Sequence, residues 1–231
     1  MKTILIRLLA LSALSISISV ASVASQTPPS PILNTLEVER LVSSNAPEDH
    51  ARLSAHFAAL AERYTADARR HTSMSRRFVG NPSRNLGAGM SVHCRRIAAL
   101  NTQSATTVGE LAAHHKALAT GAPSTPPSDN ARFDAGAGAS APTDEELDAL
   151  AAEASTPAEH RALQEYFLTL AKRYTSDADS HARMARAYRG RPRGASSAAV
   201  HCDRLVSQSR DAAKEATEAA SMHGQLADTA R

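Results

Sequence analysis

Aromatic residues and excess charge are both scarce in this chain of 231 residues. Aromatic side chains make up only 3% of the sequence, and tryptophan is absent. Any large core must therefore be built mainly from leucine and alanine. The formal net charge is only +3, which gives no electrostatic reason to expect binding to nucleic acid. There is also no basic amphipathic stripe of the kind that binds membrane surfaces.

The sequence also lacks the short motifs that identify common enzymes and cofactor proteins. It contains no GxSxG, no phosphate-binding P-loop, no CxxC and no haem-attachment CxxCH. We therefore do not expect an enzyme of a standard class. A b-type haem held by methionine and histidine inside a helical bundle is one alternative, by analogy with exported bundle cytochromes.

The first 25 residues have the pattern of a secretory signal. Lys2 and Arg7 precede or open an apolar run from Leu8 to Val20. This run is too short for a membrane anchor and leads into the sequence QTPPSP. We expect cleavage after Ser25 and export to a bacterial periplasm or secretion, with no membrane span in the mature chain. Cleavage removes two basic residues and no acidic one, so the net charge falls from +3 to +1.

A stretch that occurs twice organises the rest of the chain. The first copy reads LAERYTADARRHTSM from Leu60 to Met74, and the second reads LAKRYTSDADSHARM from Leu170 to Met184. An offset of 110 residues aligns them, and an HC dipeptide recurs further on at an offset of 108. The chain is therefore a tandem duplication. The expected units are a signal peptide at 1–25, a disordered N-terminus at 26–33, repeat 1 at 34–120, a flexible linker at 121–142 and repeat 2 at 143–231.

The spacing of the stripe residues predicts helices. His50, Phe57 and Tyr64 lie seven residues apart and are interleaved with Leu53 and Leu60. Spacing of three and four places both series on one face of a helix, whereas strand alternation does not fit. We predict an all-α fold in which each repeat is a short helix plus a hairpin of two long antiparallel helices. The two hairpins form a four-helix-bundle-like arrangement, either as one bundle or as two loosely linked ones.

Capping signals predict where the helices begin and end. The short helices should begin after Asn34 and Thr143, each with glutamate three residues further on. The first long helix of each repeat should begin with a proline and end at a Gly-x-Pro sequence. These signals place the first long helices at about 47–80 and 157–190, and the second long helices at about 88–119 and 195–230.

The apolar stripe carries histidine, aspartate and methionine at matching places in both copies. In an antiparallel hairpin, His71 should lie opposite Cys94 and His50 opposite His115, because both helices carry these residues 21 positions apart. Imidazole with thiolate or thioether favours zinc or copper. The candidate metal ligands are Asp67, His71, Met74, His93 and Cys94 with His50 and His115 in repeat 1, and Asp177, His181, Met184, His201 and Cys202 with His160 and His223 in repeat 2.

Two interpretations of this polar stripe are open. In the first, the clusters bind copper or zinc for storage, delivery or sensing. In the second, Tyr64, Asp67 and His71 form a buried hydrogen-bonded network that specifies the register of the helices. The protein would then be a non-enzymatic bundle that serves as a scaffold for an envelope protein partner.

The two cysteines also allow two interpretations. An exported chain with two cysteines suggests one disulfide. Equivalent positions in a duplicated bundle can meet across a pseudo-twofold axis, so Cys94 and Cys202 could be joined. Each cysteine also follows a histidine and should face another, which suits a thiolate that binds a metal.

Overall fold

The computed structural model describes residues 32–81, 84–121, 142–191 and 196–229. In these ranges the chain forms helices and no strand, which confirms the all-α prediction. The expected signal peptide, residues 26–31 and nearly all of the expected linker lie outside the described residues. The helices are α1 (Thr35–Val42), α2 (Pro47–Gly80), α3 (Arg84–Thr120), α4 (Asp144–Glu153), α5 (Pro157–Arg189) and α6 (Ser196–Thr229).

The helix ends follow the capping signals of the sequence. Asn34 and Glu37 form a capping box at the start of α1, in which each side chain accepts a backbone N–H from the other residue. The same reciprocal bonds begin α4 and α5. Proline occupies the first turn of both α2 and α5, where its missing N–H costs no helical bond. These predicted starts are confirmed.

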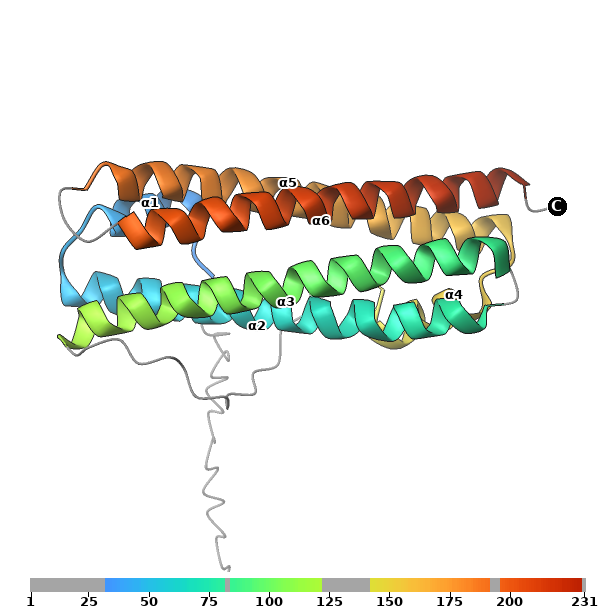
Figure 1. Cartoon of the computed structure of the whole chain (residues 1–231), viewed down its shortest axis with the longest axis horizontal. Coiled ribbons are helices and arrows are strands. Elements are labelled where there is room, and N and C mark those ends of the chain that lie inside the picture. The colour runs from blue at the N-terminus through green and yellow to red at the C-terminus, as the bar shows by residue number, and fades with distance from the viewer. Residues whose placement is uncertain (1–31, 82–83, 122–141, 192–195, 230–231) are drawn as a thin grey trace, which may run out of the picture.

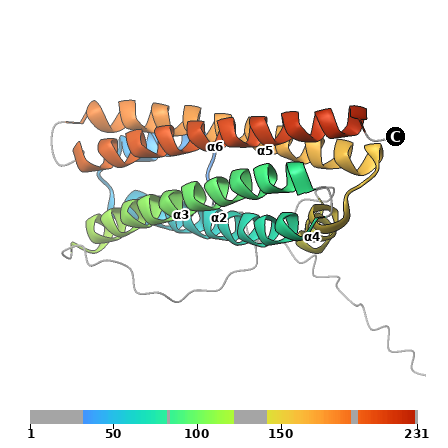
Figure 2. The same ribbon diagram turned by 45° about the vertical axis from the view of Figure 1, so that its right-hand side comes forward.

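The four long helices form one bundle rather than two separate hairpins (Figures 1 and 2). Helix α2 packs along α3, and α5 packs along α6. The two hairpins join mainly through α3 and α6, which run antiparallel. Near the middle of this contact, the Ser104 hydroxyl donates to Gln208 Oε1 at 3.2 Å. Of the described helices, none is long and apolar enough to cross a membrane.

The short helices lie between α2 and α5, one near each end of the bundle (Figure 1). Helix α1 packs on α5 as well as on α2, and its Thr35 hydroxyl is 3.0 Å from that of Ser180. Helix α4 packs mainly on α2, where Asp144 accepts from Arg70. Each short helix therefore contacts a long helix of the other repeat. Helices α2 and α5 do not touch through their backbones in the described ranges, so long side chains bridge them in the middle.

The apolar core is divided into two clusters, one beside each short helix. The α1-end core includes Val38, Phe57 and Cys202, and the α4-end core includes Met74, Phe167 and Cys94. Alanine fills much of the α6 side of the α4-end core. Both cores contain leucine at several positions, as the composition predicts.

The expected disulfide is wrong, because both cysteines are free buried thiols in different cores. The pseudo-twofold axis crosses α3 and α6 near the contact of Ser104 with Gln208. Cys94 and Cys202 precede these residues on antiparallel helices, so they lie on opposite sides of the axis. At 1.5 Å of rise per residue, they are about 24 Å apart along the bundle. Only positions close to the axis meet their counterparts.

Candidate functional site

Each end of the bundle holds a pair of buried histidines. The Nδ1 atoms of His50 and His115 are 3.1 Å apart, and those of His160 and His223 are 3.4 Å apart. Both pairings follow the predicted antiparallel register and confirm it. Burial lowers the pKa of all four rings, and it lowers that of His115 and His223 to about 3. At neutral pH these rings are uncharged, so one nitrogen of each pair donates and the other accepts.

The two histidine pairs differ in their third partner. His115 Nε2 is 2.6 Å from the hydroxyl of Tyr188. The equivalent of Tyr188 in repeat 1 is Phe78, whose ring lies 5.7 Å from that of His223. Phenylalanine has no hydroxyl, and His223 Nε2 is a buried atom without a hydrogen-bond partner in the described part of the chain. The end near α4 therefore carries an unsatisfied polar atom.

The middle of the bundle is bridged by two reciprocal ion pairs. Arg63 Nη2 donates to Asp177 Oδ2 at 2.6 Å, and the equivalent Arg173 donates to Asp67. Asp67 also accepts from Arg70 Nη1 at 3.0 Å. The predicted ligand carboxylates Asp67 and Asp177 are therefore both occupied by guanidinium groups from the other repeat. Arg63 and Arg173 occupy the same position of the duplicated stretch. This repetition was the signal in the sequence that could have identified them as partners of the two aspartates.

The histidines beside these ion pairs bond to tyrosines of the other repeat. The Tyr64 hydroxyl lies 3.2 Å from both Asp177 Oδ2 and His181 Nε2. Because its single proton points to the carboxylate, the hydroxyl accepts from the ring. His71 Nε2 lies 3.5 Å from the Tyr166 hydroxyl. Burial lowers the pKa of His71 to about 3 and that of His181 to about 4, so both rings are uncharged at neutral pH.

The predicted methionine and cysteine ligands lie in the apolar cores. Met74 and Met184 are buried among hydrophobic side chains. Burial raises the pKa of the Cys94 thiol and raises that of Cys202 to about 12. The protonated thiol is therefore the stable form at neutral pH, whereas metals bind the thiolate.

A different group of donors meets across α3 and α6. His93 Nδ1 lies 2.6 Å from Glu215 Oε2 and 3.7 Å from Glu218 Oε2. Among the described residues, this is the one group of three histidine, cysteine, aspartate or glutamate side chains whose donor atoms all lie within 4.8 Å of one another. Of the predicted ligands it includes His93 alone, and it does not join Asp67, His71 and Cys94.

Repeat 2 contains only part of this arrangement. His201 Nδ1 approaches Glu110 Oε2 at 3.0 Å, and Glu110 is the counterpart of Glu218. The counterpart of Glu215 is Thr107, so the second carboxylate is missing. Repeat analysis of the sequence could not reveal Glu215, because nothing matches it in the other copy.

A small cavity of about 240 Å³ lies between α1, α2 and α5. Of the predicted ligands, Asp177, His181 and Met184 line it, together with His56. The equivalent place near α4 is occupied by larger side chains, since Tyr166 and Arg70 are the counterparts of His56 and Ser180. His56 Nδ1 accepts the backbone N–H of Leu33 at 3.0 Å, and burial lowers the pKa of the ring to about 4.

The chain matches no family model, and no curated protein or solved structure is significantly similar to it.

Proposed function

We propose that this protein is an exported helical bundle that binds a transition metal ion, zinc or copper, at His93, Glu215 and Glu218. The observation that carries the proposal is the convergence of these three donors across the contact of α3 with α6. One imidazole and two carboxylates suit a divalent first-row ion, and two carboxylates balance its charge. Three protein ligands also leave a coordination position open for water or another ligand.

The surroundings of the three donors are compatible with this role. The side chains of His93 and Glu215 are 14% and 13% exposed, whereas that of Glu218 is 44% exposed. An ion could therefore enter from the Glu218 side. Arg96 Nη1 lies 3.1 Å from Glu215 Oε1, the oxygen that does not face His93, and can hold the carboxylate in place. On binding, the ion would take the place of the direct hydrogen bond between His93 Nδ1 and Glu215 Oε2. These two atoms are now 2.6 Å apart and would need to separate only to about 3 Å, the usual distance between two ligand atoms of one ion.

The proposal is tested by metal binding to the mature protein and its variants. After removal of metal with a chelator, titration with zinc and with copper should give one bound ion per chain, measured by calorimetry and elemental analysis. His93→Ala should abolish binding, whereas the matched control His201→Ala should retain it, because His201 has only one carboxylate. Thr107→Glu should create a second site. Absence of binding, or equal loss in both histidine variants, would contradict the proposal.

The competing function is a scaffold for an envelope protein, in which the buried polar groups are purely structural. The reciprocal bonds of Arg63 with Asp177 and of Arg173 with Asp67 favour it, because they join the repeats with no need for a ligand. Under this function, wild-type protein would bind neither metal. Export is part of both functions, and N-terminal sequencing of protein recovered from a bacterial periplasm should begin at Gln26.

A further inference from the structure

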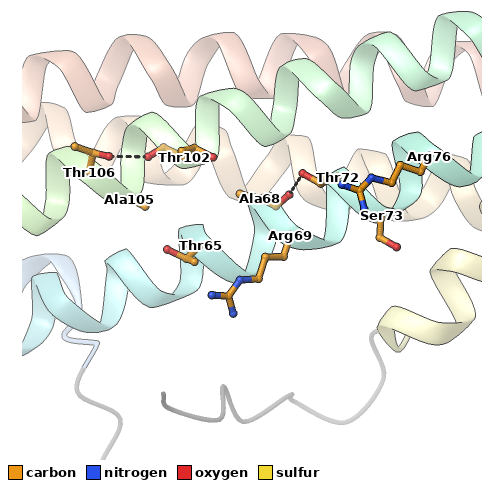
Figure 3. A pocket seen from close by; sticks show the side chains of 9 residues that line it. All are labelled: Thr65, Ala68, Arg69, Thr72, Ser73, Arg76, Thr102, Ala105 and Thr106. Atoms are coloured by element: carbon orange, nitrogen blue, oxygen red, sulfur yellow. Dashed lines mark hydrogen bonds between the residues drawn. The ribbon is translucent and has the colours of Figure 1, made fainter. Parts of the chain in front are cut away.

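A shallow groove runs between α2 and α3 on the side of repeat 1. It consists of two adjoining hollows of about 520 and 440 Å³, which share Thr72, Arg76 and Thr102. Figure 3 shows the first hollow, with Arg69 and Arg76 on α2 and the threonines Thr102 and Thr106 on α3. The groove is separate from His93 and its two glutamates, none of which lines it.

The groove is positively charged and its charge is not neutralised. Arg69, Arg76 and Arg95 line it and are exposed. None of the three forms an ion pair with a carboxylate of the described residues, and no acidic side chain lines either hollow. Three unpaired guanidinium groups along one groove attract a ligand that carries several negative charges.

The same surface of repeat 2 has a different charge pattern. The counterparts of Arg69 and Arg95 are Asp179 and Asp203, and only Arg76 keeps its charge, as Arg186. Repeat 2 carries cations of its own on this surface, because Arg210 and Lys214 replace Thr102 and Thr106, and Arg183 and Arg189 replace Ser73 and Val79. The carboxylates of Asp179 and Asp203 stand among these cations, whereas no acidic side chain lines the groove of repeat 1. Of the two equivalent surfaces, only that of repeat 1 therefore combines several cations with no carboxylate.

The uncharged groups of the groove restrict the class of ligand. The hydroxyls of Thr72 and Thr102 donate to the carbonyls four residues earlier, so their oxygens face a ligand as acceptors. A ligand that supplies N–H or O–H donors besides its negative charges therefore finds acceptors in the groove as well. No aromatic side chain lines either hollow, although sites for single-stranded nucleic acid combine basic residues with aromatic stacking surfaces. A polypeptide supplies carboxylates and backbone N–H groups without the need for stacking.

We infer that this groove binds an acidic segment of a partner polypeptide. Arg69 and Arg76 are two helical turns apart, or about 10 Å along the groove. An extended peptide rises about 3.3 Å per residue, so acidic residues at every third position match this spacing. The arginines bind the carboxylates, and the threonine oxygens accept N–H groups from the peptide backbone.

Fluorescence anisotropy with the full mature protein tests this inference. The probe is a labelled peptide of repeating Glu-Ser-Gly, and the comparison probe is a labelled single-stranded oligonucleotide of similar charge. Wild-type protein should bind the peptide more tightly than the oligonucleotide, with an affinity that falls as salt rises. Arg76→Asp should weaken peptide binding by about tenfold or more. The double variant of Arg69→Asp with Arg95→Asp should abolish it.

Arg186→Asp is the matched control, because it makes the same charge change at the same position of repeat 2. It should leave peptide affinity nearly unchanged, and circular dichroism should show that every variant keeps the helical content of the wild type. Equal weakening by Arg76→Asp and Arg186→Asp would overturn the inference, since binding would then depend only on net charge. Tighter binding of the oligonucleotide, or no binding of the peptide at low salt, would also overturn it. None of these variants changes a proposed metal ligand, so a failure of peptide binding can be distinguished from a failure of metal binding.

Discussion

Arg63 of repeat 1 donates from Nη2 to Asp177 Oδ2 of repeat 2 at 2.6 Å, and the equivalent Arg173 of repeat 2 donates to Asp67 of repeat 1. The bundle is thus joined by the same contact made twice in opposite directions. Both pairs bridge α2 and α5, whose backbones are held apart in the described structure. A shift of one hairpin by a helical turn would separate both pairs at once, so together they specify the register of the repeats.

Removal of one partner of this pair should destabilise the protein. The side chains of Arg63 and Asp177 are 26% and 16% exposed, so Arg63→Met leaves a partly buried carboxylate without its partner. We expect a loss of about 2 kcal/mol in the free energy of unfolding, measured by urea denaturation. The control is Arg189→Met, which removes an exposed partner of Asp203 and should cost less than about 1 kcal/mol. Equal effects of the two changes would contradict the assigned role.

A single hydroxyl should distinguish the two ends of the bundle. Tyr188→Phe removes the partner of His115 Nε2 and should cost about 1–2 kcal/mol, because it leaves a buried polar atom unsatisfied. Phe78→Tyr should place a hydroxyl near the unsatisfied His223 Nε2 and stabilise the protein by up to about 1 kcal/mol. Urea denaturation measures both changes. If Phe78→Tyr lowers the free energy of unfolding as much as Tyr188→Phe does, position 78 is not placed relative to His223 as Tyr188 is placed relative to His115.

The buried histidines should make the protein sensitive to acid. The pKa of His71, His115 and His223 is lowered to about 3, and that of His56 and His181 to about 4, from an ordinary value of 6.5. Between these values the unfolded chain binds more protons than the folded one, so stability rises with pH. The contribution is complete above about pH 6.5 and is lost as the pH falls from there to about 4 for His56 and His181 and to about 3 for the other three rings. Each ring contributes up to about 1.4 kcal/mol per pH unit.

Urea denaturation at several pH values between 7 and 4 measures this dependence. His71→Phe should reduce the slope of stability against pH by about one proton in this range, whatever its effect on stability at pH 7. A constant free energy of unfolding from pH 7 to pH 5 would show that these rings do not remain uncharged in the folded protein.

The cysteines should behave as two protected thiols. Cys94 and Cys202 are buried and free, and burial disfavours the reactive thiolate of each. We expect no reaction of the native mature protein with Ellman's reagent and release of two equivalents after unfolding in denaturant. Mass spectrometry after proteolysis without reduction provides the second measurement, and a peptide that links the two repeats would contradict this expectation.

The sequence alone was sufficient to predict the helices and the antiparallel pairing of the two long helices within each repeat. Capping residues such as Asn34 and Thr143 predicted the starts of the short helices, and the 21-residue spacing predicted the contact of His50 with His115. Helix α3 begins at Arg84, before the expected start at about 88. These features depend on residues that are near each other in sequence or that share one hairpin.

Contacts between the repeats could not be predicted from the same patterns. Asp67, His71 and His93 each have a partner in repeat 2, and the identity of that partner depends on where the pseudo-twofold axis crosses the helices. The periodicity of one hairpin does not determine that position. For the same reason the sequence left open a disulfide between Cys94 and Cys202, which the structure excludes because both thiols are free and the axis lies well away from them.

The pseudo-twofold axis relates two repeats of one covalent chain, and this affects the variety of sites that the chain can carry. A dimer of identical subunits must place the same residue on both sides of its twofold axis. In this chain the two sides are encoded separately, so repeat 1 can have Thr107 at the position that Glu215 occupies in repeat 2. Likewise His56 leaves a cavity where Tyr166 fills the space. Covalent linkage of the repeats thus allows one self-complementary interface to hold two sites of different chemistry.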